Sequence, residues 1–88
     1  PFNLACYAIL TQMIAQETNL ELGIFSHYIN DAHIYENHIE SLKEQLKRDP
    51  LQLSQLKIKN KPFWELEFND FELLNYQHHP IIKFPVAV

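Results

Sequence analysis

The chain has 88 residues, a length that fits a single domain. Hydrophobic residues make up 47% of it and charged residues 20%, a composition that excludes a disordered chain. The formal net charge is -4 at pH 7, which argues against non-specific binding to nucleic acid or anionic lipid, because both depend on excess positive charge. The single cysteine, Cys6, excludes an internal disulfide, and we therefore expect a cytoplasmic protein.

The first expected element is a helix over residues 3–16, with Asn3 as its N-cap and Thr18 near its end. Its apolar residues surround the helix axis, a pattern typical of a buried helix. Cys6 lies among them and is expected to be a small buried packing residue rather than a reactive thiol. A chain of this length has few layers to cover such a helix, so we expect a piece of a longer protein, or a second subunit.

Residues 20–35 alternate between apolar and polar positions, which predicts a long strand with a bend near Asn30. The period changes at Glu36, where an amphipathic helix is expected to begin and to continue until the stretch before Pro50. Glu40 and Lys43 should be neighbours on its solvent side.

The second half of the chain is expected to hold shorter elements. Residues 51–59 and 71–74 are typical of strands, and residues 60–62 of a turn. Residues 63–68 fit no single element, and residues 77–88 predict an extended tail because prolines recur there. The expected class is therefore α+β, in one block.

Three residues carry polar groups that could bind a ligand: Asn3, His33 and Tyr35. His33 and Tyr35 are two apart on the predicted strand, so both side chains leave the same face and could hold one hydroxyl group. Spacing alone favours the alternative that they are ordinary sheet residues. The amide of Asn3 could match the N3–H and O4 edge of uracil, and cytosine presents the reverse pattern, although a helix N-cap is the simpler role. The five histidines lack the spacing of a metal site, and we expect none.

Several stretches together resemble thymidylate synthase, over the whole chain and in one register: PFNLACYAIL, LELGIF, DAHIYENH, LKIK, DFELLNY and HHPIIKFPVAV. The resemblance implies an α+β fold with a bent mixed β-sheet packed with helices. Residues 1–88 would be the C-terminal part of a single domain, with 1–84 as its sheet and helix part and 85–88 as a lid tail.

The same resemblance implies a methyltransferase of dTMP biosynthesis, a cytoplasmic homodimer that reductively methylates dUMP to dTMP with 5,10-methylenetetrahydrofolate and no metal. It places Asn3 on the pyrimidine base, and His33 and Tyr35 on the 3′-hydroxyl of the sugar. It places four residues on the folate: Phe2, Val86, Ala87 and Val88.

The family's nucleophile, a cysteine between proline and histidine, does not occur in this chain. We therefore expect it upstream of Pro1, and the chain alone to be inactive. Phe84 stands where the family usually has a small residue, and Ile24 where an acid is usual. Two alternatives remain open: a dUMP hydroxymethylase of the same fold, and a non-catalytic interaction fragment whose apolar helix seeks a partner.

Overall fold

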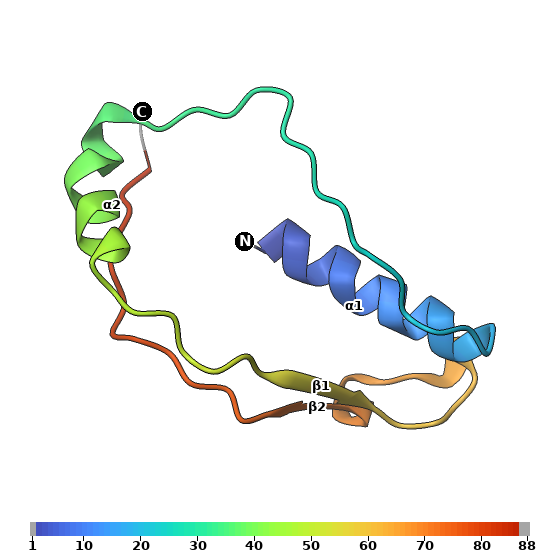
Figure 1. Cartoon of the computed structure of the whole chain (residues 1–88). Helices are drawn as coiled ribbons and strands as arrows, with labels where there is room; N and C mark the ends of the chain where they lie inside the picture. The colour runs from blue at the N-terminus through green and yellow to red at the C-terminus, as the bar shows by residue number, and fades with distance from the viewer. Residues whose placement is uncertain (1, 87–88) are drawn as a thin grey trace.

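The computed structural model describes residues 2–86 of the chain, which form helices, short 3₁₀ turns and a small sheet (Figure 1). In chain order these elements are α1 (Phe2–Glu17), η1 (Glu36–His38), α2 (Ile39–Leu46), β1 (Gln55–Ile58), η2 (Phe63–Glu65), η3 (Phe68–Asp70) and β2 (Phe71–Leu74). Helices and an antiparallel strand pair in one chain give the α+β class expected from the sequence.

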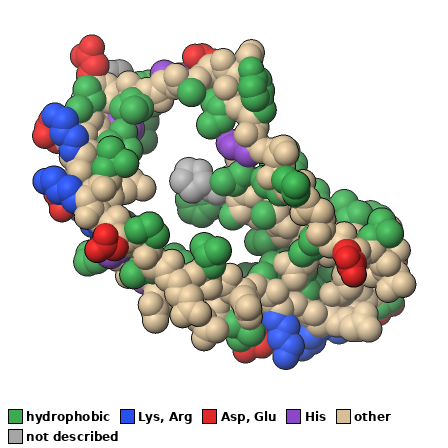
Figure 2. All heavy atoms as spheres, in the orientation of Figure 1, with side chains coloured by type: hydrophobic (Ala, Val, Ile, Leu, Met, Phe, Trp, Pro, Cys, Tyr) green, Lys and Arg blue, Asp and Glu red, His purple; other side chains and the backbone are tan. Residues whose placement is uncertain are grey.

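The chain forms an open ring rather than a packed globule. Its radius of gyration is 16.6 Å, whereas a compact domain of this length would have about 12 Å. Within residues 2–86 no hydrophobic side chain is buried, and hydrophobic side chains border the opening that remains when all atoms are drawn (Figure 2). None of the helices formed by the described residues is long and apolar enough to cross a membrane.

Helix α1 confirms the first expected element and extends it by one residue at each end. Asn19 adopts the left-handed conformation with φ 53°, and the N–H groups of Asn19 and Leu20 donate to the carbonyl oxygens of Gln16 and Ala15. These two bonds form a Schellman motif, in which Asn19 occupies the left-handed position that glycine usually occupies. Because the helix begins at Phe2, Asn3 lies in its first turn, and the expected N-cap role is wrong.

The expected burial of α1 is not found. Cys6 is exposed, and so is most of the helix surface, because only one side of α1 meets another element of the described chain. On that side the amides of Gln12 and Gln16 donate to the carbonyl oxygens of Leu56 and Lys59, at 3.0 and 2.9 Å. Hydrogen bonds therefore hold the helix against β1 and the residue that follows it, while several large apolar side chains of the helix remain exposed.

The long strand predicted over residues 20–35 is absent, and this prediction is wrong. The segment runs as an irregular arc between α1 and η1, with a bend at Asn30 and Asp31 as expected (Figure 1). A strand requires a neighbour to accept and donate its backbone hydrogen bonds. No segment within residues 2–86 provides one, although the alternating pattern is present.

Helix α2 confirms the second expected helix, with the turn η1 leading into it. The ammonium of Lys43 lies 2.7 Å from the carboxylate of Glu40, as the spacing predicted. Exposed pairs of this kind contribute about 0.3–0.5 kcal/mol each, so they add little to the stability of the helix.

Strands β1 and β2 pair antiparallel, with Gln55 opposite Leu74 and Ile58 opposite Phe71. The strand expected over residues 51–59 is thus shorter than predicted, because β2 offers only four residues for pairing. Of the bent mixed sheet expected from the resemblance, residues 2–86 supply this antiparallel pair. The segment between the strands contains the two short turns η2 and η3.

Asp70 anchors this hairpin. Asp70 is only 4% exposed, and its carboxylate accepts from the ammonium of Lys61 at 2.8 Å and from the backbone N–H of Glu67 at 3.0 Å. Lys59 approaches the other oxygen at 3.1 Å. The hydrogen bond from Lys61, followed by the one from Glu67, holds the pKa of Asp70 far below its ordinary value.

Asp70→Asn is expected to lower the melting temperature at pH 7, because an amide lacks the charge that attracts both lysines. A depressed folded-state pKa stabilises the fold above the ordinary pKa of aspartate, near 4, and this stabilisation is lost as pH falls toward the folded value. The difference in melting temperature, followed by circular dichroism, should therefore shrink below about pH 4. Asp49→Asn is the control at an exposed aspartate. A difference that stays constant between pH 2 and 7 would contradict the ion-pair account.

Residues 77–86 form the extended tail that the prolines predicted, with no helix or strand. The tail runs back along α2, so that the described end of the chain lies near η1 (Figure 1). The last two residues of the chain lie outside the described part.

Candidate functional site

His33 and Tyr35 lie side by side at the end of the arc that leads into η1. Their ring centroids are 5.4 Å apart in an edge-to-face arrangement, so the extended backbone keeps both side chains together even without a sheet. The imidazole Nδ1 of His33 lies 3.6 Å from the carboxylate of Asp31. The side chain of His33 is 57% exposed, and Tyr35 is 51% exposed, which leaves both accessible to a ligand.

The row of rings continues beyond this pair. The ring of His38 lies 5.4 Å from that of Tyr35 and 5.3 Å from that of Phe84, edge to face in both cases. Its Nε2 atom lies 2.6 Å from the carbonyl oxygen of Pro85. A carbonyl oxygen only accepts, so Nε2 carries the proton and donates it. The four side chains form an aromatic row from the arc to the tail: His33, Tyr35, His38 and Phe84.

Further side-chain hydrogen bonds hold the tail against the rest of the chain. Ser41 donates to Lys83 at 3.2 Å and Arg48 donates to Pro80 at 2.7 Å. His79, on the tail itself, donates from Nε2 to the carbonyl oxygen of Asp49 at 2.9 Å. The tail therefore has a defined course although it contains no regular structure, since side chains take the place of a backbone ladder.

Asn3 and Phe2 lie in the first turn of α1, which points into the opening of the ring (Figure 1). Both are exposed, and no hydrogen bond from the side chain of Asn3 is found within residues 2–86. The structure does not bring Asn3 into contact with His33 or Tyr35; the turn and the arc face the same opening from different sides. Any ligand joining them must therefore fill that space.

The folate residues expected from the resemblance are only partly described. Phe2 is 87% exposed and Val86 is 83% exposed, so both offer free apolar surface. The expectations for Ala87 and Val88 fall outside the described residues.

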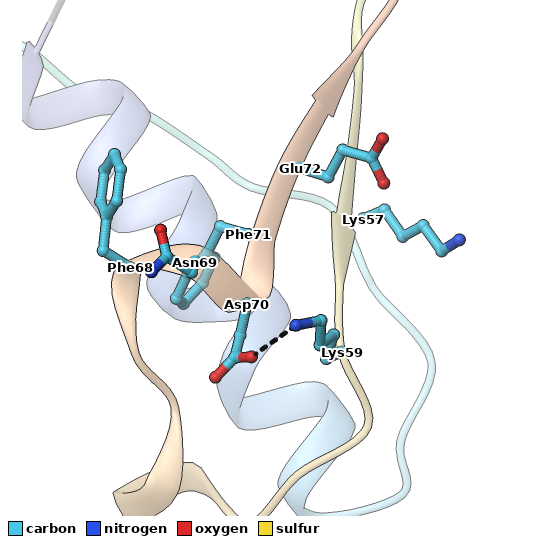
Figure 3. A pocket seen from close by; sticks show the side chains of 7 residues that line it. All are labelled: Lys57, Lys59, Phe68, Asn69, Asp70, Phe71 and Glu72. Atoms are coloured by element: carbon cyan, nitrogen blue, oxygen red, sulfur yellow. Dashed lines mark ion pairs between the residues drawn. The ribbon is translucent and has the colours of Figure 1, made fainter.

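A hollow lies beside the hairpin, with a volume of about 330 Å³ and walls that include Lys57, Phe68 and Phe71 (Figure 3). Two of its charged groups, Lys59 and Asp70, pair with each other at 3.1 Å. We assign it a structural role. Within residues 2–86 no cluster of three or more His, Cys, Asp or Glu side chains is placed to hold a metal ion.

The His33–Tyr35 pair thus lies on an α+β chain, and a tail held by side-chain hydrogen bonds runs beside it. The family model of thymidylate synthase matches residues 1–88, and the chain belongs to the thymidylate synthase family. It is 51% identical over 89 residues to the thymidylate synthase of Mycoplasma pneumoniae, with 100% of this chain and 31% of that protein covered. It is 50% identical over 90 residues to the thymidylate synthase of Francisella philomiragia, with 100% and 33% covered.

The fold is similar to a solved structure as well. The thermostable thymidylate synthase A from Bacillus subtilis superposes with a TM-score of 0.89 at 38% identity, with 100% of this chain and 32% of that chain covered. The family and the fold class expected from the sequence are thus confirmed. The chain spans about a third of the length of these relatives.

Sequence reasoning missed the contacts of His38 with Tyr35, Phe84 and Pro85. The signal was present, since His38 ends the HIYENH stretch that carried the resemblance, but spacing along the chain does not reveal a partner 47 positions away. Arg48, the single arginine of the sequence, donates to the carbonyl oxygen of Pro80, a contact that the sequence did not indicate.

Proposed function

We propose that this chain is part of an enzyme that reductively methylates dUMP to dTMP with 5,10-methylenetetrahydrofolate as the one-carbon donor. The observation that carries the proposal is the match of the family model across residues 1–88, which includes the PFN, HIYENH and PVAV stretches in order. Dihydrofolate is the second product, and no metal takes part.

Asn3 recognises the base in this proposal. Its amide oxygen accepts from N3–H of uracil and its amide nitrogen donates to O4. Cytosine carries an acceptor at N3 and a donor at position 4, so both bonds would become mismatches. The exposed position of Asn3, in a helix turn facing the opening of the ring, supports this role.

His33 and Tyr35 hold the 3′-hydroxyl of the deoxyribose. A phenol and an imidazole can each donate or accept, so a hydroxyl between them can form one bond of each kind. The 5.4 Å separation of the ring centroids and the exposure of both side chains support this arrangement.

Residues 1–84 form the sheet and helix part of a single domain in this proposal, and residues 85–88 form its lid. The catalytic cysteine lies upstream of Pro1, so the chain by itself is inactive. Cys6 is not that nucleophile, since it sits within α1 and not between proline and histidine. The uncovered apolar surface of α1 packs against the remainder of the enzyme, a cytoplasmic homodimer.

The tail covers the folate. Phe2 and Val86 offer exposed apolar surface for the pterin and aminobenzoyl groups, and Ala87 and Val88 complete the cover. A lid of this kind excludes water from the reacting carbon and commits both substrates to reaction.

The test of the reaction is product analysis with the full-length enzyme that contains this chain, supplied with dUMP and 5,10-methylenetetrahydrofolate. We expect dTMP and dihydrofolate in equal amounts. Formation of 5-hydroxymethyl-dUMP with tetrahydrofolate would replace the proposal with the hydroxymethylase alternative.

Tyr35→Phe in the full-length enzyme is expected to weaken dUMP binding about 3- to 10-fold, the effect of one lost hydrogen bond. Affinity for 2′,3′-dideoxyuridine monophosphate, which lacks the 3′-hydroxyl, should not change. Calorimetric titration of both nucleotides measures the difference. Tyr28→Phe, at an 86% exposed tyrosine of the same segment, is the matched control. Equal losses for both nucleotides would contradict a bond to the 3′-hydroxyl.

A further inference from the structure

We propose that His38 is a positioning residue that couples the His33–Tyr35 pair to the C-terminal tail, so that the nucleotide and the folate bind cooperatively. The inference rests on the proposed function for the identity of the two ligands. What it adds is a residue that touches neither ligand and communicates between their sites.

The first argument is that His38 has contacts in both directions. Its ring packs edge to face on Tyr35, with an interplanar angle of 82°, and on Phe84, with an angle of 85°. The hydrogen bond from Nε2 to the carbonyl oxygen of Pro85 fixes the ring plane, because rotating the ring would break the bond. His38 is also half-buried, unlike the exposed residues on either side of it.

The second argument concerns the two ends of the row. Tyr35 is half exposed, so a ligand hydroxyl bound to its phenol would restrict a ring that solvent otherwise leaves free. The tail has no helix or strand of its own, so side-chain contacts decide its course. A restriction passed from Tyr35 through His38 therefore reaches Phe84 and Pro85, next to the residues assigned to the folate. Coupling of this kind acts equally in both directions.

The third argument is Phe84 itself. The resemblance leads one to expect a small residue at this position, and a phenylalanine in an open tail would otherwise expose its whole ring. Here Phe84 is 37% exposed, and its ring packs against that of His38. The bulky substitution thus adds a contact to the row, and this chain should couple its two sites more strongly than relatives with a small residue there.

Ser41 provides the comparison that separates coupling from simple tethering. Its hydroxyl donates to the carbonyl oxygen of Lys83, one residue before Phe84, and within the described residues no hydrogen bond joins it to a ring of the aromatic row. Removing it loosens the tail and leaves the row intact.

The experiment titrates dihydrofolate into the full-length enzyme with and without saturating dUMP. The ratio of the two dissociation constants is the coupling factor, which we expect to be at least about fivefold. His38→Ala should reduce it about fivefold, and Phe84→Ala about twofold, while the dissociation constant of dUMP alone stays within twofold. His38→Gln keeps an amide donor for Pro85 but has no ring. In the absence of dUMP, the His38→Gln enzyme should bind dihydrofolate as tightly as the unmodified enzyme does. Its coupling factor should stay as low as that of His38→Ala.

Ser41→Ala should weaken dihydrofolate binding equally with and without dUMP, and so leave the coupling factor unchanged. A coupling factor unaffected by His38→Ala, or reduced as much by Ser41→Ala, would overturn the inference. If the unmodified enzyme binds dUMP but its coupling factor is one, the inference about His38 is also overturned, whereas the proposed function is not affected. An unmodified enzyme that does not bind dUMP would remove the proposed function itself.

Discussion

Asn3→Asp in the full-length enzyme is expected to lower the preference for dUMP over dCMP by at least about 100-fold, measured as the ratio of kcat/KM values. An ionised carboxylate only accepts hydrogen bonds, so it faces the O4 oxygen of uracil without a donor. The 4-amino group of cytosine can donate a hydrogen bond to this carboxylate. When the introduced carboxyl group is protonated, it can also donate a hydrogen bond to the N3 atom of cytosine. The change therefore penalises one nucleotide and favours the other.

Asn19→Asp is the matched control for this change. It introduces the same charge at the opposite end of α1, where Asn19 ends the helix in a conformation that aspartate also tolerates. We expect no change in preference between the nucleotides. An unchanged preference in Asn3→Asp, with normal folding by circular dichroism, would contradict the assignment of Asn3 to the base.

Deletion of Val88 is the second change with a large expected effect. A lid that no longer closes misplaces the folate and admits water, and we expect kcat/KM for 5,10-methylenetetrahydrofolate to fall about 100-fold or more. The dissociation constant of dUMP alone should change less than threefold, because the nucleotide contacts proposed for this chain lie elsewhere. Titrations of dUMP and of dihydrofolate, with steady-state kinetics, separate the two effects.

The control for the deletion is Ile81→Val, which trims an 86% exposed side chain of the same tail without shortening its end. It should leave both dissociation constants unchanged. Equal loss of dUMP and dihydrofolate binding on deletion of Val88 would contradict the lid, since it would mean that the tail supports the whole site.

The candidate site illustrates what pattern reading can and cannot find. The pairing of His33 with Tyr35 followed from their spacing of two, and their rings are neighbours in the structure. The link from His38 to Phe84 and Pro85 joins segments nearly fifty residues apart, and no local spacing encodes it. The tethers from Ser41 and Arg48 to the tail were missed for the same reason.

The fold shows the same division. Both helices and β2 were predicted, because each follows from local periodicity and end signals such as Asn19. The strand over residues 20–35 and the burial of Cys6 were wrong, because both need a neighbouring element. Alternating apolar and polar residues indicate an extended segment that could join a sheet, and a helix with apolar residues all round indicates one that could lie in a core. Neither pattern shows whether a neighbouring element is present to pair with the segment or to cover the helix.

By itself, the sequence determined the family, the α+β class and the approximate positions of α1 and α2 along the chain. Only the tertiary structure decided that the tail returns along α2, that His38 stands between Tyr35 and Phe84, and that Asp70 collects two lysines. The physical reason is that these interactions act over different separations along the chain. Backbone hydrogen bonds and helix ends act within a few residues, whereas ion pairs, ring contacts and burial depend on which distant segments the chain brings together.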